Sequence, residues 1–225
     1  MDAFRIWAGL MALLAAVLCA LPLFDVLGYE WCLVMAVAVS FAAAQLACAR
    51  TIAARTRRPP SAATAASAHP GATVARLYGG NVVAAWQLLV VPLALVTCNA
   101  LRVRNCDFSA GLAWFAMLPL LSAALAAALG TAVGLVRPWS RALLPSLLAV
   151  GGVVLSIAWG VWRFYAAPPI FGYDPFVGYF AGSLYDEELA ITTAFGWARL
   201  YHATLAATAL SLIALLLDGP TLALR

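Results

Sequence analysis

Residues 31–49 read WCLVMAVAVSFAAAQLACA, an uninterrupted run without a charged side chain, and Arg50 follows at once. A membrane-spanning helix needs about 20 apolar residues, because each residue adds about 1.5 Å and the hydrocarbon layer is about 30 Å thick. This run therefore predicts a helix that crosses a lipid bilayer.

Five similar runs account for most of the remaining chain. They cover residues 6–24, 82–101, 112–136, 142–162 and 195–217. The 225 residues are 65% hydrophobic and 10% charged, whereas a soluble domain carries about a quarter charged residues. We therefore expect an all-α, polytopic transmembrane bundle of about six spans, a single multi-pass domain over residues 1–225.

The arginines indicate the orientation of this bundle, because basic residues near span ends stay in the cytoplasm. With the N-terminus inside, the inner side holds Arg5, Arg50, Arg55, Arg57, Arg58, Arg76, Arg137, Arg141 and Arg225. The outer side holds Arg102, Arg104, Arg163 and Arg199. Both termini are thus predicted to be cytoplasmic. All thirteen basic residues are arginine, a bias typical of high-GC bacteria, so we expect a bacterial inner membrane.

Two connections stand out. Residues 50–80 combine basic residues with an Ala/Ser/Thr/Pro stretch that cannot build a core, which predicts a flexible, basic cytoplasmic loop. Residues 164–193 read FYAAPPIFGYDPFVGYFAGSLYDEELAITT, too apolar for a solvated coil. We expect residues 163–194 to form an ordered outer cap or re-entrant element between the fifth and sixth spans.

This cap carries the candidate outer contact site for a substrate or partner. The site comprises Phe171, Tyr173, Asp174, Phe176, Tyr179, Tyr185, Asp186 and Glu187. The acidic residues could bind a cation or a basic partner, although carboxylates just before a helix also favour its positive end.

Polar residues inside the spans are costly in lipid and form a second set of candidates, namely Arg199, His202 and Gln87. Arg199 and His202 lie three positions apart and so share a helix face. We expect Arg199 to extend outward and pair with Asp186 or Glu187. The spans contain no Asp or Glu for a proton relay, which argues against an ion-driven carrier.

Small residues at four-residue spacing predict close helix packing at Gly130, Gly134, Gly152 and Gly160. Cys32 and Cys106 both lie near outer span ends and could form a disulfide, with two free thiols as the alternative. The chain has only two histidines and lacks hydrolase and phosphate-loop motifs. We therefore expect neither an enzyme nor a bound metal or cofactor. The net charge of +4 is scattered along the chain, which argues against nucleic-acid binding.

Two resemblances follow from these features. The order of parts is similar to the membrane domain of ABC-type exporter permeases, which have six helices and a basic connection that meets the ATPase. Separately, RNCD at 104–107 with Gly111, PPIFGYDPFVGYF at 168–180 and LYDE at 184–187 resemble the N-terminal membrane region of large bacterial envelope proteins. Some of those continue into a metallopeptidase-like or tetratricopeptide region, which this sequence lacks.

The resemblances imply two alternative functions. The first is a permease-like domain that works with a separate ATPase docked on residues 50–80. The second is a membrane anchor or scaffold for a fused soluble domain, without transport of its own. In both, the lipid bilayer is the principal partner.

Overall fold

The computed structural model describes residues 3–57, 69–105, 107–136, 142–166, 171–181 and 189–217. Each predicted apolar run lies largely within one helix or within one continuous rod of helices. The helices are α1 (Ala3–Leu18), α2 (Tyr29–Thr56), α4 (Pro70–Asn99), α5 (Phe108–Phe115), α6 (Leu121–Val136), α7 (Leu143–Ala166) and α8 (Thr193–Leu216). A π-helical segment, η1 (Ala116–Leu120), joins α5 and α6 into one rod. The strands β1 (Phe171–Asp174) and β2 (Gly178–Ala181) form an antiparallel hairpin.

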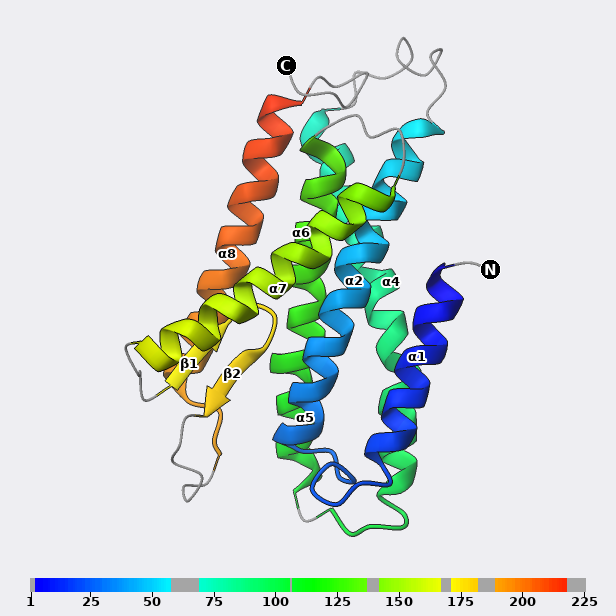
Figure 1. Ribbon diagram of the computed structural model, residues 1–225, viewed down its shortest axis with the longest axis vertical. Helices are drawn as coiled ribbons and strands as arrows, with labels where there is room; N and C mark the ends of the chain where they lie inside the picture. The colour runs from blue at the N-terminus through cyan, green and yellow to red at the C-terminus, as the bar shows by residue number, and fades with distance from the viewer. Residues whose placement is uncertain are drawn as a thin grey trace.

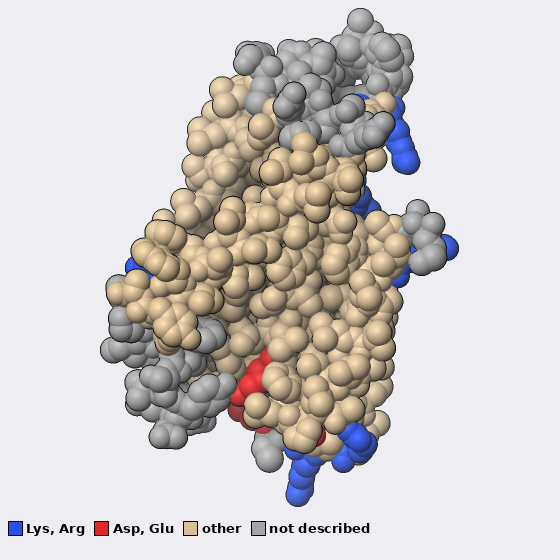
Figure 2. Space-filling view, viewed as in Figure 1, with Lys and Arg blue, Asp and Glu red and all other residues tan. Residues whose placement is uncertain are grey.

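The structure confirms an all-α polytopic bundle. Within the described ranges, five helical rods are long and apolar enough to cross a membrane: α2, α4, α5 with η1 and α6, α7, and α8. The α5–α6 rod runs beside α2 through the centre, α1 and α4 lie on one side, α8 lies on the other, and α7 crosses the bundle obliquely (Figure 1). A band without charged side chains separates the two ends of the visible face (Figure 2).

The first predicted span is shorter than expected. The apolar run extends to residue 24, but α1 ends at Leu18 and residues 19–28 form turns. Pro22 explains this difference, because proline lacks the N–H that the helix would need and disfavours helical backbone before it. With 16 residues, α1 is about 24 Å long, less than the hydrocarbon thickness of about 30 Å.

The predicted flexible loop over residues 50–80 is also shorter. α2 continues to Thr56, and α4 begins at Pro70, which occupies the first helical position, where its missing N–H costs nothing. Arg55 stabilises the extended α2 because its guanidinium donates to the carbonyls of Gly134 and Leu135, both at 3.0 Å, near the end of α6. Residues 58–68 lie outside the described part of the chain.

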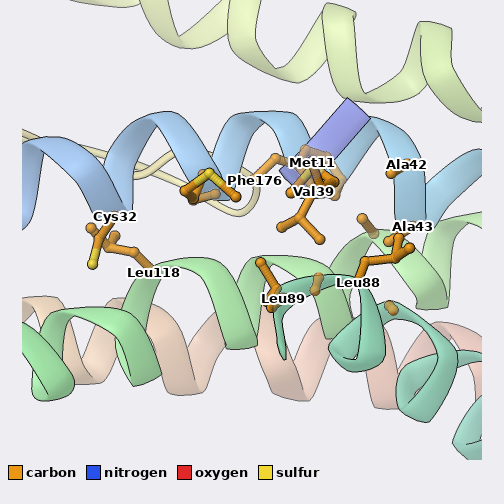
Figure 3. Packing of buried hydrophobic residues seen from close by; sticks show 14 of the residues in the cluster. Met11, Cys32, Val39, Ala42, Ala43, Leu88, Leu89, Leu118 and Phe176 are labelled. Atoms are coloured by element: carbon orange, nitrogen blue, oxygen red, sulfur yellow. The ribbon is translucent and has the colours of Figure 1, made fainter. Parts of the chain in front are cut away.

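The centre of the bundle is the contact between α2 and α6. A Cβ atom at Gly130 would lie 2.2 Å from the carbonyl oxygen of Ala44, and one at Gly134 would lie 2.9 Å from Cβ of Thr51. The two backbones therefore approach as closely as glycine allows. This increases the dispersion contacts that hold helices together in lipid, where the hydrophobic effect does not drive their association. On another face of α2, Val39 and Ala43 point toward Leu88 and Leu89 of α4 (Figure 3).

A buried polar cluster links the same helices. The Asn81 amide on α4 donates to the hydroxyls of Thr51 at 3.1 Å and Thr131 at 3.0 Å. The side-chain amide oxygen of Asn81 accepts from Nε of Arg50 at 3.2 Å. Since unpaired amides are expensive in an apolar interior, this network fixes the register of α2, α4 and α6.

Polar side chains at and after the end of α4 secure the turns at the opposite end. Asn99 donates to the carbonyl of Asp25 at 2.6 Å, and Arg102 donates to the carbonyl of Cys19 at 2.6 Å. Asp107 begins α5 by accepting from the Ala110 N–H at 2.9 Å. This bond, together with the Ser109 hydroxyl, lowers the pKa of the exposed Asp107 carboxyl.

Replacement of Gly130 by leucine should destabilise the protein by about 1 to 3 kcal/mol or more, because the side chain would force α2 and α6 apart. Gly151 on α7 is the matched control position, since a Cβ atom added there would have no neighbouring atom within 4 Å. Thermal unfolding of Gly130→Leu and Gly151→Leu in detergent measures the difference. Equal midpoints for the two variants would contradict the packing argument.

Candidate functional site

Arg199 is the centre of the candidate site. It lies in the second turn of α8 and is only 1% exposed. Its guanidinium donates to four backbone carbonyls and one hydroxyl. The acceptors are Met117 O at 2.8 Å, Leu118 O at 3.4 Å, Asp174 O at 3.3 Å, Pro175 O at 2.9 Å and Ser122 Oγ at 2.7 Å. Within the described part of the chain, the charge is therefore held by dipoles rather than by a direct ion pair.

Two of these carbonyls come from η1, an irregular segment in the middle of an apolar rod. Pro119 lies inside it and supplies no N–H, so the regular hydrogen-bond ladder is interrupted. A π-helical turn leaves carbonyls directed away from the helix ladder, and such turns often occur at functional sites. Here side chains donate to these carbonyls. Arg199 donates to Met117 O and Leu118 O, and Trp86 Nε1 donates to Leu120 O at 3.0 Å.

The other two carbonyls belong to the turn of the β-hairpin. The Asp174 carboxylate stabilises this turn by accepting from the N–H groups of Phe176 and Val177, both at 2.8 Å. Gly178 completes it at φ +94°, a conformation that side chains rarely adopt. A Cβ atom there would also lie 2.9 Å from Nη2 of Arg199. Only glycine lets the turn approach the guanidinium this closely.

The hairpin enters the bundle rather than lying across its end. Phe176 at the turn is buried, and its carbonyl accepts from the hydroxyl of Ser40 at 3.3 Å. Ser40 lies about 16 Å along α2 from the first residue of that helix, at 1.5 Å per residue. Tyr179 is also buried and its carbonyl accepts from the Tyr29 hydroxyl at 2.8 Å. The expected cap is therefore a short re-entrant hairpin between α7 and α8 (Figure 1).

Aromatic rings fill the space beside the hairpin. Tyr179 stacks on Trp114 with centroids 6.0 Å apart, and Tyr173 stacks on Phe195 at 6.0 Å. The guanidinium carbon of Arg199 lies 5.5 Å from the centre of the Phe195 ring, which adds a cation–π contact. These contacts bury the apolar surface of the hairpin and so offset the cost of ordering it.

The predicted extension of Arg199 to the membrane surface is wrong. Its side chain is buried and donates to carbonyls of the hairpin turn and η1. The prediction treated α8 as a helix in lipid, where a long basic side chain extends to the surface. The predicted pairing with Asp186 or Glu187 stays a prediction. Tyr185, Asp186 and Glu187 lie outside the described residues, as does Cys106, the predicted disulfide partner of Cys32.

A pocket of about 470 Å³ opens between α7, the hairpin and α8. We call it the hairpin pocket; its lining includes Ser156, Trp159, Gly160, Tyr173, Asp174 and His202. Gly160, predicted to pack against a helix, instead lies beside the hairpin, where a Cβ atom would be 3.9 Å from Oδ2 of Asp174. That oxygen accepts from the Ser156 hydroxyl at 2.6 Å.

His202 supplies an unsatisfied polar group at this pocket. Its Nδ1 atom is buried and has no hydrogen-bond partner among the residues that the structure describes. Leaving such a group unpaired costs about 1 to 3 kcal/mol. His202 and Arg199 thus share one side of α8 but have different roles: Arg199 holds the hairpin, and His202 faces the pocket.

The remaining predicted residues lie elsewhere. Gln87 is on the exposed side of α4, and of Phe171 only the backbone, in β1, is described. Gly152 packs against Leu129, whose side chain would lie 3.0 Å from an added Cβ. Cys32 is buried, with Sγ 3.9 Å from the carbonyl oxygen of Gly111.

Sequence reasoning missed two polar groups that complete the site, and a third, Asn81, in the contact of α2, α4 and α6. Ser122 binds Arg199 and Ser156 binds Asp174, but serine is common in membrane helices and neither stands out. Asn81 is buried between helices, but it lies just before the predicted apolar run 82–101 and was not singled out. The local signal for η1 was Pro119, since proline within a span frees backbone carbonyls.

No protein family, no curated protein and no solved structure matches this chain. Its function must therefore be inferred from the geometry of these sites.

Replacement of Arg199 by methionine should lower the free energy of unfolding by at least about 3 kcal/mol, because four buried carbonyls would lose their donor. Arg163→Met on α7 is the control, since Arg163 is exposed. Thermal unfolding in detergent compares the two. If both variants unfold at the wild-type temperature, Arg199 does not hold the hairpin.

Proposed function

We propose that this integral membrane domain binds an apolar or amphipathic molecule in the hairpin pocket and functions as a permease-like domain for such a cargo. The observation that carries the proposal is a mostly apolar pocket of about 470 Å³ whose lining includes His202, a residue whose Nδ1 has no hydrogen-bond partner among the described residues. Ligand sites are commonly clefts of about 300 to 1,000 Å³ with apolar walls and a few polar groups.

The chemistry of the lining supports an amphipathic ligand. Trp159, Tyr165 and Tyr173 provide apolar ring surface, whereas His202 and Arg163 provide polar groups. The Asp174 carboxylate is already occupied by three donors within the described structure. A ligand in this pocket would therefore place its apolar part against the rings and a hydrogen-bonding group toward His202. Small inorganic ions do not match such walls.

The membrane orientation of the domain extends the proposal to an ATPase partner. The arginine distribution supports a bacterial inner membrane with the α2–α4 connection in the cytoplasm. A separate ATPase would meet the domain on that side, where α2 and α4 extend as helices to Thr56 and from Pro70. These helix ends give such a partner a rigid surface.

One observation favours the alternative, a membrane anchor or scaffold. The α2–α6 contact at Gly130 is as close as backbones permit, and the Asn81 network ties α4 to both helices. A bundle centre of this kind favours a rigid domain over one whose helices move apart during transport. The anchor needs no ligand in the hairpin pocket, so ligand binding separates the two functions.

Photo-crosslinking tests the proposal. The probe is a single-chain alkyl phosphocholine that carries a diazirine, added to the protein in lipid nanodiscs. We expect saturable crosslinks at Tyr165 and Tyr173, which excess unlabelled probe removes. Gly160→Trp should abolish most of this labelling, because the indole would occupy the pocket beside Asp174.

Gly151→Trp is the matched control, since Gly151 lies on the same helix but has open space beside it and does not line the hairpin pocket. It should label like the wild type. Labelling that does not saturate, or that is equal in both variants, would reject the pocket as a ligand site and leave the anchor as the better account.

A further inference from the structure

The short first helix leaves a groove at the other end of the bundle. α1 has 16 residues and α2 has 28, lengths of about 24 and 42 Å at 1.5 Å per residue. Because turns connect them at the hairpin end, α1 stops well short of the far end of α2 (Figure 1). The space above its N-terminus, between α2 and α4, is a groove of about 670 Å³.

Four arginines from three helices line this groove, which we call the arginine groove. They are Arg5 on α1, Arg50 and Arg57 on or next to α2, and Arg76 on α4. Arg50 and Arg57 are seven positions apart, so they lie on one face of α2, two turns from each other. Basic side chains lie along the upper part of the flank on the α1 side (Figure 2).

No carboxylate lines the arginine groove among the residues that the structure describes. Like charges gathered without a counter-charge repel one another, so an anion placed between them would be favoured. Arg50 is held in place by its bond to Asn81, at 3.2 Å between Nε and the amide oxygen. This bond uses one of the five guanidinium N–H groups and connects the groove to the buried Asn81 network.

The walls between the arginines are apolar. Phe4, Leu46 and Leu77 line the groove together with small residues of α2, and Gly80 leaves open space where a side chain would stand. The groove thus combines cationic groups with apolar walls, and α1 itself carries exposed apolar side chains at Ile6, Leu10 and Leu13. That combination matches a phosphate head group attached to hydrocarbon chains rather than a freely soluble anion.

We propose that the arginine groove binds the head group of an anionic phospholipid, with its acyl chains along α1. Basic pockets between membrane helices at the cytoplasmic surface bind such head groups, because the phosphate meets several arginines where anionic lipids are abundant. The site lies at the opposite end from the hairpin pocket and does not depend on the function proposed there.

Native mass spectrometry and thermal unfolding in detergent test this site. The probes are phosphatidylglycerol, cardiolipin, phosphatidylcholine and inorganic phosphate, each added to the same full-length protein. We expect both anionic lipids to remain bound and to raise the unfolding temperature more than phosphatidylcholine does. Each of Arg57→Gln and Arg76→Gln should weaken this binding about fivefold, the typical effect of one arginine near an anionic surface.

Arg104→Gln is the matched control, an exposed arginine at the hairpin end of the bundle that removes the same charge. It should retain wild-type lipid binding. Equal binding of phosphatidylcholine and phosphatidylglycerol, or equal losses in all three variants, would overturn the site. Stabilisation by inorganic phosphate equal to that by the lipids would overturn the lipid assignment and show a site for free phosphate.

Discussion

The structure depends on a buried positive charge that has no direct carboxylate partner among the described residues. Arg199 is almost fully buried, and the acceptors around it are carbonyls of the hairpin turn and of η1, together with Ser122. A guanidinium in an apolar bundle is costly unless each N–H finds an acceptor. Irregular backbone at membrane depth is equally costly unless each carbonyl finds a donor. The guanidinium N–H groups and the irregular carbonyls satisfy one another only when Arg199, the hairpin turn and η1 are in contact.

This mutual requirement shapes the rest of the site. The hairpin turn must reach Arg199, so Gly178 adopts a positive φ and Asp174 binds the turn amides through its carboxylate. The inserted hairpin separates α7 from α8 and creates the hairpin pocket between them. His202, one turn from Arg199, then faces this pocket without a partner in the described residues. At the other end, the short α1 exposes arginines of α2 and α4, so the two ends of the bundle offer different chemistry.

The sequence predicted the fold class well because long apolar runs form helices for reasons of composition alone. It also predicted an ordered, folded-back segment at the Asp174–Pro175 turn, where glycines and aromatic residues rule out a solvated coil. It failed for Arg199 because the acceptors on η1 lie 81 and 82 positions away along the chain, and no local pattern indicates such a contact. Pro22 was a local signal that would have shortened the first span.

Hydrogen exchange on the protein in lipid nanodiscs is the most direct test of the inserted hairpin. The amides of Phe176 and Val177 donate to the Asp174 carboxylate within a partly buried turn, in which Phe176 is buried. We predict that both exchange slowly, at rates comparable with the central residues of α2. Exchange at the rate of an unfolded peptide would show that the hairpin is not inserted and that Arg199 does not hold it.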